Sequence, residues 1–126
     1  MYKLALVGLG GFIGAISRYA LSGLAHRLLG SSFPWGTLAV NIIGCFLIGG
    51  LMVFAEDRAV LTPQLRLLLG IGFLGAFTTF STFGYESFEL LRDRQLLYLA
   101  LNLAVSIVGG LTAVWAGRIL IRHLFL

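Results

Sequence analysis

The chain has 126 residues, of which 59% are hydrophobic and only 11% are charged, and its net charge is +4. Soluble domains carry about 25% charged residues, so this composition, with a mean hydropathy of +0.98, excludes an ordinary soluble protein. We predict one all-α integral membrane domain covering residues 1–126. The basic residues stand singly or in pairs at the ends of apolar stretches, which indicates anchoring at the membrane surface rather than binding of nucleic acid.

Four apolar stretches are each long enough to cross about 30 Å of hydrocarbon. They cover 4–21, 36–55, 67–91 and 96–121. The apolar run of the first exceeds the core of a signal peptide, about 7 to 15 residues, so we expect it to be retained as a span. We also expect Glu56, Asp57 and Arg58 to mark a water-exposed turn, and Thr62 and Pro63 to begin the third span as N-cap and first turn.

The charges at the ends of these spans bear on orientation. Four spans place both termini and the central loop on one side of the membrane, which then carries five Lys and Arg residues against three or four on the other. This bias is too weak to select one orientation, so we infer that copies insert both ways. The first side holds Lys3, Arg58, Arg66, Arg118 and Arg122, and the second holds Arg27, Arg92 and Arg94, with Arg18 near it.

The first two spans combine small residues with isolated polar ones. Gly10 and Gly14 have the small-xxx-small spacing that lets helices approach closely. Arg18, about one turn from the end of the first span, either extends to the interface, or caps the C-terminus of a neighbouring helix or attracts anions to a vestibule. Asn41, about two turns into the second span, either links two helices by hydrogen bonds or donates to a permeating anion.

The stretch 69–85 is a poor sequence for an uninterrupted lipid-facing helix. It combines glycine, Thr and Ser hydroxyls and phenylalanine without a charge, so we predict a break near Gly75 to Thr79. Irregular backbone at membrane depth persists only where protein or a wet cavity surrounds it, so this broken span should build a site. Phe80 and Phe83 lie on one face beyond the break; they serve either in packing or as ring edges that favour an anion. Carbonyls freed at the break can hold a cation.

The fourth span places Tyr98, Asn102 and Ser106 on one helical face, which either lines a pore or forms a helix interface. The first, second and fourth spans contain no His, Lys, Asp or Glu deep in the membrane, which argues against an enzyme and against a proton-coupled exporter. Cys45 is the single cysteine, so a disulfide framework is excluded and a metal cluster is not expected. The expected hydrogen-bonding groups are therefore neutral: Asn41, Thr78, Thr79, Ser81, Thr82, Asn102 and Ser106.

These residues resemble the Fluc family of fluoride channels. The resemblance covers the first three spans in order, and the length and number of spans agree. It rests on Gly-Phe-Ile-Gly-Ala at 11–15 followed by Arg18 and Tyr19, on Gly-Thr-Leu-Ala-Val-Asn-Ile-Ile-Gly at 36–44, and on Gly-Phe-Leu-Gly-Ala-Phe-Thr-Thr-Phe-Ser-Thr-Phe at 72–83. The fourth span matches only in general character. These channels often carry a pore-facing serine at the position where this chain has Gly110.

The resemblance implies an antiparallel, dual-topology homodimer with two fluoride pores in the cell membrane, the bacterial inner membrane, and passive fluoride export that lowers toxicity. It also implies a structural sodium ion held by the backbone carbonyls of Gly75 and Thr78. By motif match, the fluoride pathway comprises Phe80, Phe83, Asn41, Ser81, Thr82, Arg18 and Glu86. Ser106 is a further candidate for this pathway, and the resemblance leaves open whether it replaces the fourth-span serine.

Two other classes of protein have four spans or a similar composition. A dual-topology multidrug exporter needs a carboxylate in its first span, and 4–21 contains none. An assembly subunit that does not transport would use its glycines only for packing. Such a subunit should tolerate isoleucine at Phe80 or Phe83, whereas a fluoride pore should lose conduction.

Overall fold

The computed structural model describes residues 1–56 and 60–125, so the predicted turn at Asp57 and Arg58 lies outside the described residues. The chain is all-helical in these ranges, and four of the described segments are long and apolar enough to cross a membrane. They are α1 (Tyr2–Leu29), α2 (Trp35–Glu56), a third segment built from α3 (Pro63–Leu65), η1 (Arg66–Leu74), α4 (Gly75–Phe77) and α5 (Phe80–Arg92), and α6 (Leu96–Phe125).

The helical segments extend beyond the predicted apolar stretches, by the most at the end of the first. Helix α1 continues to Leu29, where 4–21 was predicted. No proline lies between Leu21 and Gly30, and the one glycine there, Gly23, does not end the helix. Gly30, with a positive φ of 87°, ends it. The predicted start of the third segment is confirmed, because the Thr62 side chain accepts a hydrogen bond from the Leu65 N–H at 3.2 Å and Pro63 follows at the first helical position.

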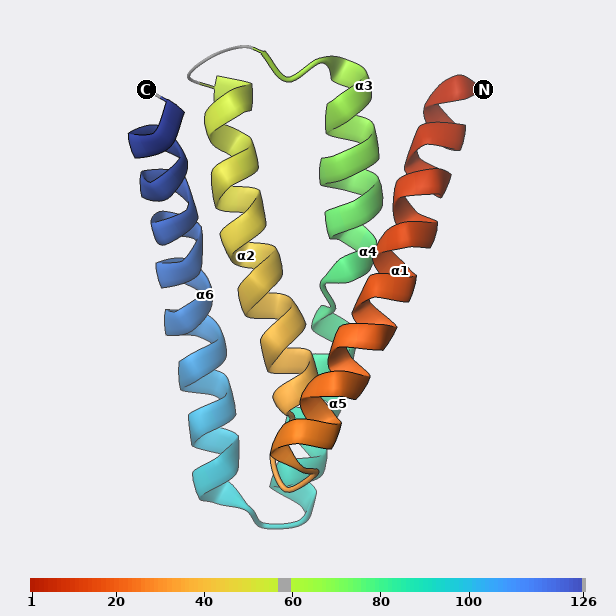
Figure 1. The fold of residues 1–126 in the computed structure, drawn as a ribbon. Coiled ribbons are helices and arrows are strands. Elements are labelled where there is room, and N and C mark those ends of the chain that lie inside the picture. Colours follow the sequence, from red (N-terminus) through yellow and green to blue (C-terminus); the bar gives the residue numbers. More distant parts are fainter. Residues whose placement is uncertain (57–59, 126) are drawn as a thin grey trace.

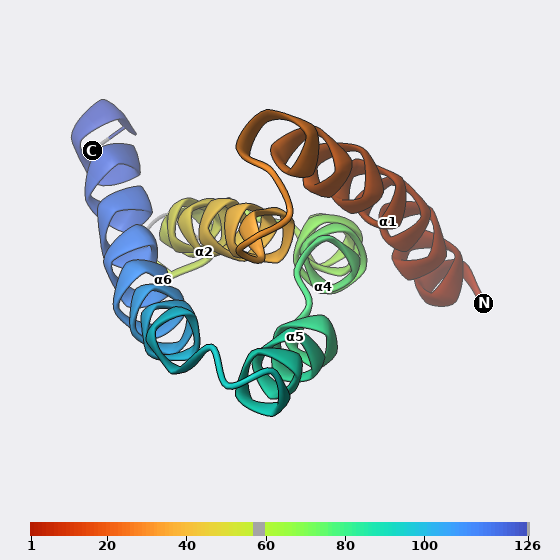
Figure 2. The same cartoon turned by 90° about the horizontal axis from the view of Figure 1, so that it is seen from below.

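The four segments run alternately up and down, as four spans require. Figure 1 shows both termini at the end of the molecule where α2 ends and α3 begins, and the turns that follow α1 and α5 at the opposite end. Seen from below, α2 and α4 occupy the centre, with α6 beside α2 and α1 beside α4 (Figure 2). Helix α5 lies to one side and packs mainly against α6.

Glycine permits the closest helix contacts. A Cβ atom added at Gly10 would collide with the backbone carbonyl of Leu68, and one added at Gly14 with that of Phe73. Both carbonyls belong to η1, so the predicted small-xxx-small pair is confirmed as the contact that joins α1 to the third segment. Helices α2 and α6 meet in the same way, through Gly49 and Gly117.

Two arginines that the charge count treated as interface anchors have partners at the end of α2. Arg66 donates from Nη2 to the carbonyl of Ala55 at 3.0 Å. Arg118 forms an ion pair with Glu56, with Nη1 and Oε2 2.8 Å apart. Both cations therefore lie where the C-terminal carbonyls of α2 carry partial negative charge.

Candidate functional site

The third segment is interrupted at Thr78 and Thr79. Both residues are extended, with φ −86° and ψ 160° at Thr78 and φ −150° and ψ 122° at Thr79. The break falls inside the predicted range, Gly75 to Thr79. Before it, η1 is wound as a π-helix, a feature that the sequence did not predict and that is common near functional sites.

The side chain of Asn41 replaces the backbone hydrogen bonds that the break removes. Thr79 N–H donates to Asn41 Oδ1 at 2.8 Å, and Asn41 Nδ2 donates to the Thr79 carbonyl at 2.9 Å. In a continuous helix that Thr79 N–H would reach the carbonyl of Gly75, so the pairing releases the Gly75 oxygen. Asn41 thus links two helices, and the second hydrogen of Nδ2 is available to another acceptor.

Thr79 also begins the outgoing half of the segment. Its Oγ1 accepts a hydrogen bond from the Thr82 N–H at 3.3 Å and donates to Thr82 Oγ1 at 3.1 Å. Thr79 is therefore the N-cap of α5, and the predicted propensity of threonine to take over backbone hydrogen bonds is confirmed at this residue.

Arg18 reaches the same break from α1. Its Nη1 lies 3.5 Å from the carbonyl of Thr78, which follows the last residue of α4, and its side chain is half-buried. Of the two alternatives left open by the sequence, the structure favours an arginine that caps a neighbouring helix. Arg18 therefore places a positive charge beside Thr78, and the next residue, Thr79, is the one that bonds to Asn41.

Two cavities flank the break. One, of about 380 Å³, is lined by residues that include Asn41, Gly75, Thr78, Thr79 and Phe80. The other, of about 630 Å³, is lined by residues that include Arg18, His26, Thr37, Thr82 and Glu86. Thr79, at the break, borders both cavities.

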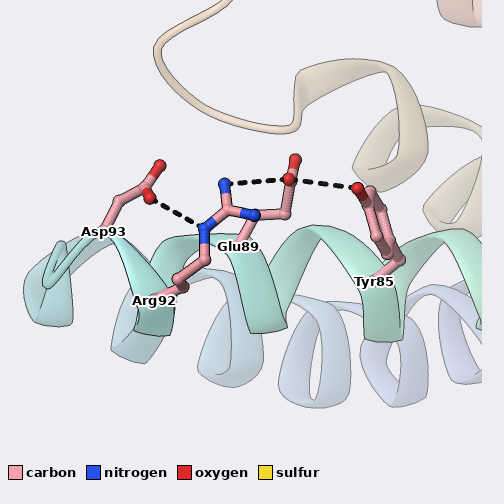
Figure 3. A network of polar contacts seen from close by, with 4 residues as sticks. All are labelled: Tyr85, Glu89, Arg92 and Asp93. Carbon is pink, nitrogen blue, oxygen red and sulfur yellow. Dashed lines mark hydrogen bonds and ion pairs between the residues drawn. The ribbon is translucent and has the colours of Figure 1, made fainter.

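The two glutamates of α5 have different surroundings. Glu86 Oε1 accepts a hydrogen bond at 2.9 Å from Oγ1 of Thr37, which is 5% exposed, while its Oε2 is buried without a hydrogen-bond partner among the described residues. Glu89 instead accepts hydrogen bonds at 3.1 Å from Tyr85 and from Arg92, which also pairs with Asp93 on the exposed side of the helix (Figure 3). Glu86 therefore belongs to the cavity and Glu89 to the surface.

The two predicted phenylalanines lie next to each other on α5. Their ring centroids are 5.7 Å apart with an angle of 45° between the planes. Phe80 is 83% exposed and Phe83 is half-buried in the single subunit. Ser81 and Thr82 between them are exposed.

Comparison with known proteins shows the family to which the chain belongs. A family model described as CrcB-like protein, Camphor Resistance (CrcB), matches residues 5–118. A protein of Geobacter sp. (strain M21) named fluoride-specific ion channel FluC is 49% identical over 124 residues, which cover 98% of this chain and 100% of the relative. This chain belongs to the CrcB family. Among other relatives, the FluC of Nitrosococcus oceani is 49% identical over 115 residues, or 91% of this chain and 92% of the relative. The FluC 1 of Methanosarcina acetivorans is 46% identical over 119 residues, which cover 94% of this chain and 90% of the relative.

In this CrcB protein the break brings together most of the residues predicted for the site. Gly75, Thr78, Asn41 and Phe80 line the smaller cavity, and Arg18, Thr82 and Glu86 line the larger one. The linings of these two cavities, as the described residues form them, do not include Phe83, Ser81 or Ser106.

Sequence reasoning missed two residues that hold the site together. Thr37 donates to Glu86, and Ser87 accepts a hydrogen bond from Asn102. The spacing offered a signal for the first, because Thr37 lies four residues before Asn41 and so on the same face of α2. Ser87 gave no such signal, since its role depends on which residue of α6 faces it.

Of the three polar residues predicted on one face of α6, Tyr98 and Asn102 contact other parts of the subunit. Asn102 is 1% exposed and bonds to Ser87, and the ring of Tyr98 contacts that of Phe33 edge-on with centroids 5.9 Å apart. Ser106 is half-buried.

Proposed function

We propose that this CrcB protein is a fluoride-selective channel that lets fluoride leave the cytoplasm passively. The observation that carries the proposal is the broken third segment, where an amide, hydroxyls and an arginine lie around the break. The chain is also about half identical, over nearly its full length, to proteins named fluoride-specific ion channels. The protein is a multi-pass membrane protein, and its relatives are channels and not enzymes.

The chemistry of the site suits a small, strongly hydrated anion. Removing the water around fluoride must be offset by several hydrogen-bond donors at once. Asn41 Nδ2 retains one hydrogen for this purpose, and Ser81, Thr82 and Ser106 add hydroxyls. Phe80 and Phe83 contribute positive ring edges, Arg18 attracts the anion, and Glu86 lines the pathway with Thr37. A negative-inside potential then drives fluoride out by about 2.3 kcal/mol per charge per 100 mV.

The functional unit in this proposal is an antiparallel homodimer of copies inserted in both orientations. The weak charge bias supports dual insertion. Large apolar side chains remain exposed near the break, notably Phe80 at 83%, Ile71 at 61% and Phe88 at 59%. A second copy would cover such side chains and enclose the pathway.

A structural sodium ion belongs to the same proposal. The Gly75 carbonyl loses its helical partner because the Thr79 N–H bonds to Asn41, and both Gly75 and Thr78 line the smaller cavity. Carbonyl oxygens are hard ligands of the kind that coordinate such cations in unwound spans. The ion, when bound, would supply a positive charge at the break. Arg18 lies against the Thr78 carbonyl and would share that oxygen with it.

The experiment is fluoride efflux from liposomes reconstituted with purified protein, followed with a fluoride electrode. Rapid fluoride release without chloride release is expected, and empty vesicles are the control. Folded, dimeric protein in sodium that releases no fluoride above this control would refute the proposal and favour an assembly subunit.

A further inference from the structure

Helix α5 carries most of the proposed fluoride pathway, yet few of its side chains are packed inside the subunit. Ser87 is the one buried residue of α5, all of which the structure describes. Its neighbours within the subunit are mainly α6 and, to a lesser extent, α2. A helix with so little buried surface needs directed contacts to fix its rotation about its own axis.

The buried contact between α5 and α6 is a hydrogen bond. Asn102 Nδ2 donates to Ser87 Oγ at 3.0 Å, and the two residues are 1% and 9% exposed. Asn102 is among the three largest fully buried side chains in the described part of the chain. A buried amide without a partner is unfavourable at membrane depth, so rotating α5 away from Asn102 carries a penalty.

The position of this contact relates it to the pathway. Ser87 lies four residues after Phe83 and seven after Phe80, so all three share one face of α5. Ser106 lies four residues after Asn102 on α6. Helices α5 and α6 run in opposite directions and are joined by a short turn (Figure 1). A contact between Ser87 and Asn102 therefore brings Phe83 and Ser106, each one turn further along its helix, to the same level.

We propose that Asn102 is a positioning residue, whose hydrogen bond to Ser87 holds α5 at the rotation and level that present Phe83 and Ser106 to the same section of the fluoride pathway. This inference rests on the proposed function. Asn102 itself acts through Ser87 and does not touch the ion.

The test uses full-length protein in the fluoride efflux assay, with the ratio of fluoride to chloride release as a second readout. Ser87→Ala removes the acceptor, Asn102→Leu removes the donor at similar volume, and the double variant removes both. The exchange S87N with N102S restores a donor and an acceptor in reversed order. Thr112→Ala, which removes an exposed hydroxyl elsewhere on α6, is the matched control.

Each single variant should lower the fluoride rate by about threefold to twentyfold, the range that one buried hydrogen bond between membrane helices spans. Each should also lower selectivity over chloride. The double variant should lose no more than the worse single variant, the exchange should recover most of the rate, and Thr112→Ala should match wild type. A loss of folded protein with unchanged selectivity in the remainder would identify a merely structural contact and overturn the inference.

Two further outcomes are separable. Wild-type protein that releases no fluoride overturns the proposed function and this inference with it. Wild-type protein that conducts, with Ser87→Ala unchanged in rate and selectivity, overturns this inference alone. Should Asn102→Leu not assemble, Ser87→Ala decides, because it removes only one hydroxyl.

Discussion

Asn41 should stabilise the break more than any other single side chain, and its replacement by leucine tests this. Leucine has a similar size but leaves the N–H and the carbonyl of Thr79 without the partners seen at 2.8 and 2.9 Å. An unsatisfied buried polar group costs about 1–3 kcal/mol, whereas hydrogen bonds between membrane helices average about 0.6 kcal/mol and reach about 1.7. Because Asn41 is only half-buried, we expect Asn41→Leu to lower the free energy of unfolding by about 1–3 kcal/mol for the two bonds together.

A second variant separates the two hydrogen bonds. Asn41→Asp keeps an acceptor for the Thr79 N–H but has no donor for the Thr79 carbonyl, so it should lose about half as much stability. Its negative charge should nevertheless abolish fluoride release, because it repels the anion. Stability is measured by reversible unfolding in mixed detergent micelles, and release by liposome efflux. Gln64→Leu, which replaces an exposed amide at the start of the third segment, is the control. Asn41→Leu with wild-type stability, or Asn41→Asp with wild-type fluoride release, would refute this account of the break.

Four further predictions follow from other contacts. Gly14→Ala should destabilise the fold by about 1–3 kcal/mol or more, because its Cβ meets the Phe73 backbone; Gly8→Ala, with nothing within 4 Å among the described residues, should unfold like wild type in the same titration. Thr37→Val should lower fluoride release by about tenfold or more, because Glu86 loses the hydrogen bond that Thr37 donates. A hydrogen bond to a charged group contributes about 1.5–3 kcal/mol. Unchanged release would contradict this role of Thr37. Phe83→Ile should abolish fluoride release while the protein elutes from size-exclusion chromatography at the wild-type volume. Full activity would favour an assembly subunit. Replacing sodium by N-methylglucamine during purification should lower the unfolding temperature in calorimetry and slow fluoride release, and indifference to the cation would argue against a carbonyl-bound ion.

Composition and local spacing were sufficient for the membrane class, the four spans and the place of the break. These properties depend on neighbours in the sequence. The length of an apolar run decides whether it can cross the bilayer. Thr62 caps the first turn of its own helix and Pro63 follows at the first helical position. The two threonines at 78–79, which are extended in the structure, have a low helix propensity of their own. Helix α1 continues beyond the apolar stretch 4–21, because loss of hydropathy does not itself end a helix, and it ends at Gly30.

The tertiary structure decided which polar groups meet. From the sequence, Asn41 can either link two helices or donate to an anion; in the structure both of its amide atoms bond to Thr79. Arg18 can either extend to the membrane interface or cap a helix; in the structure it lies beside the carbonyl of Thr78. Ser87 and Asn102 are 15 residues apart on different helices, and their pairing depends on how α5 and α6 are rotated against each other. Sequence periodicity places residues on the faces of their own helix, but the rotation of one helix against another is set by the packing of all of them, which is why these pairings appear only in the folded chain.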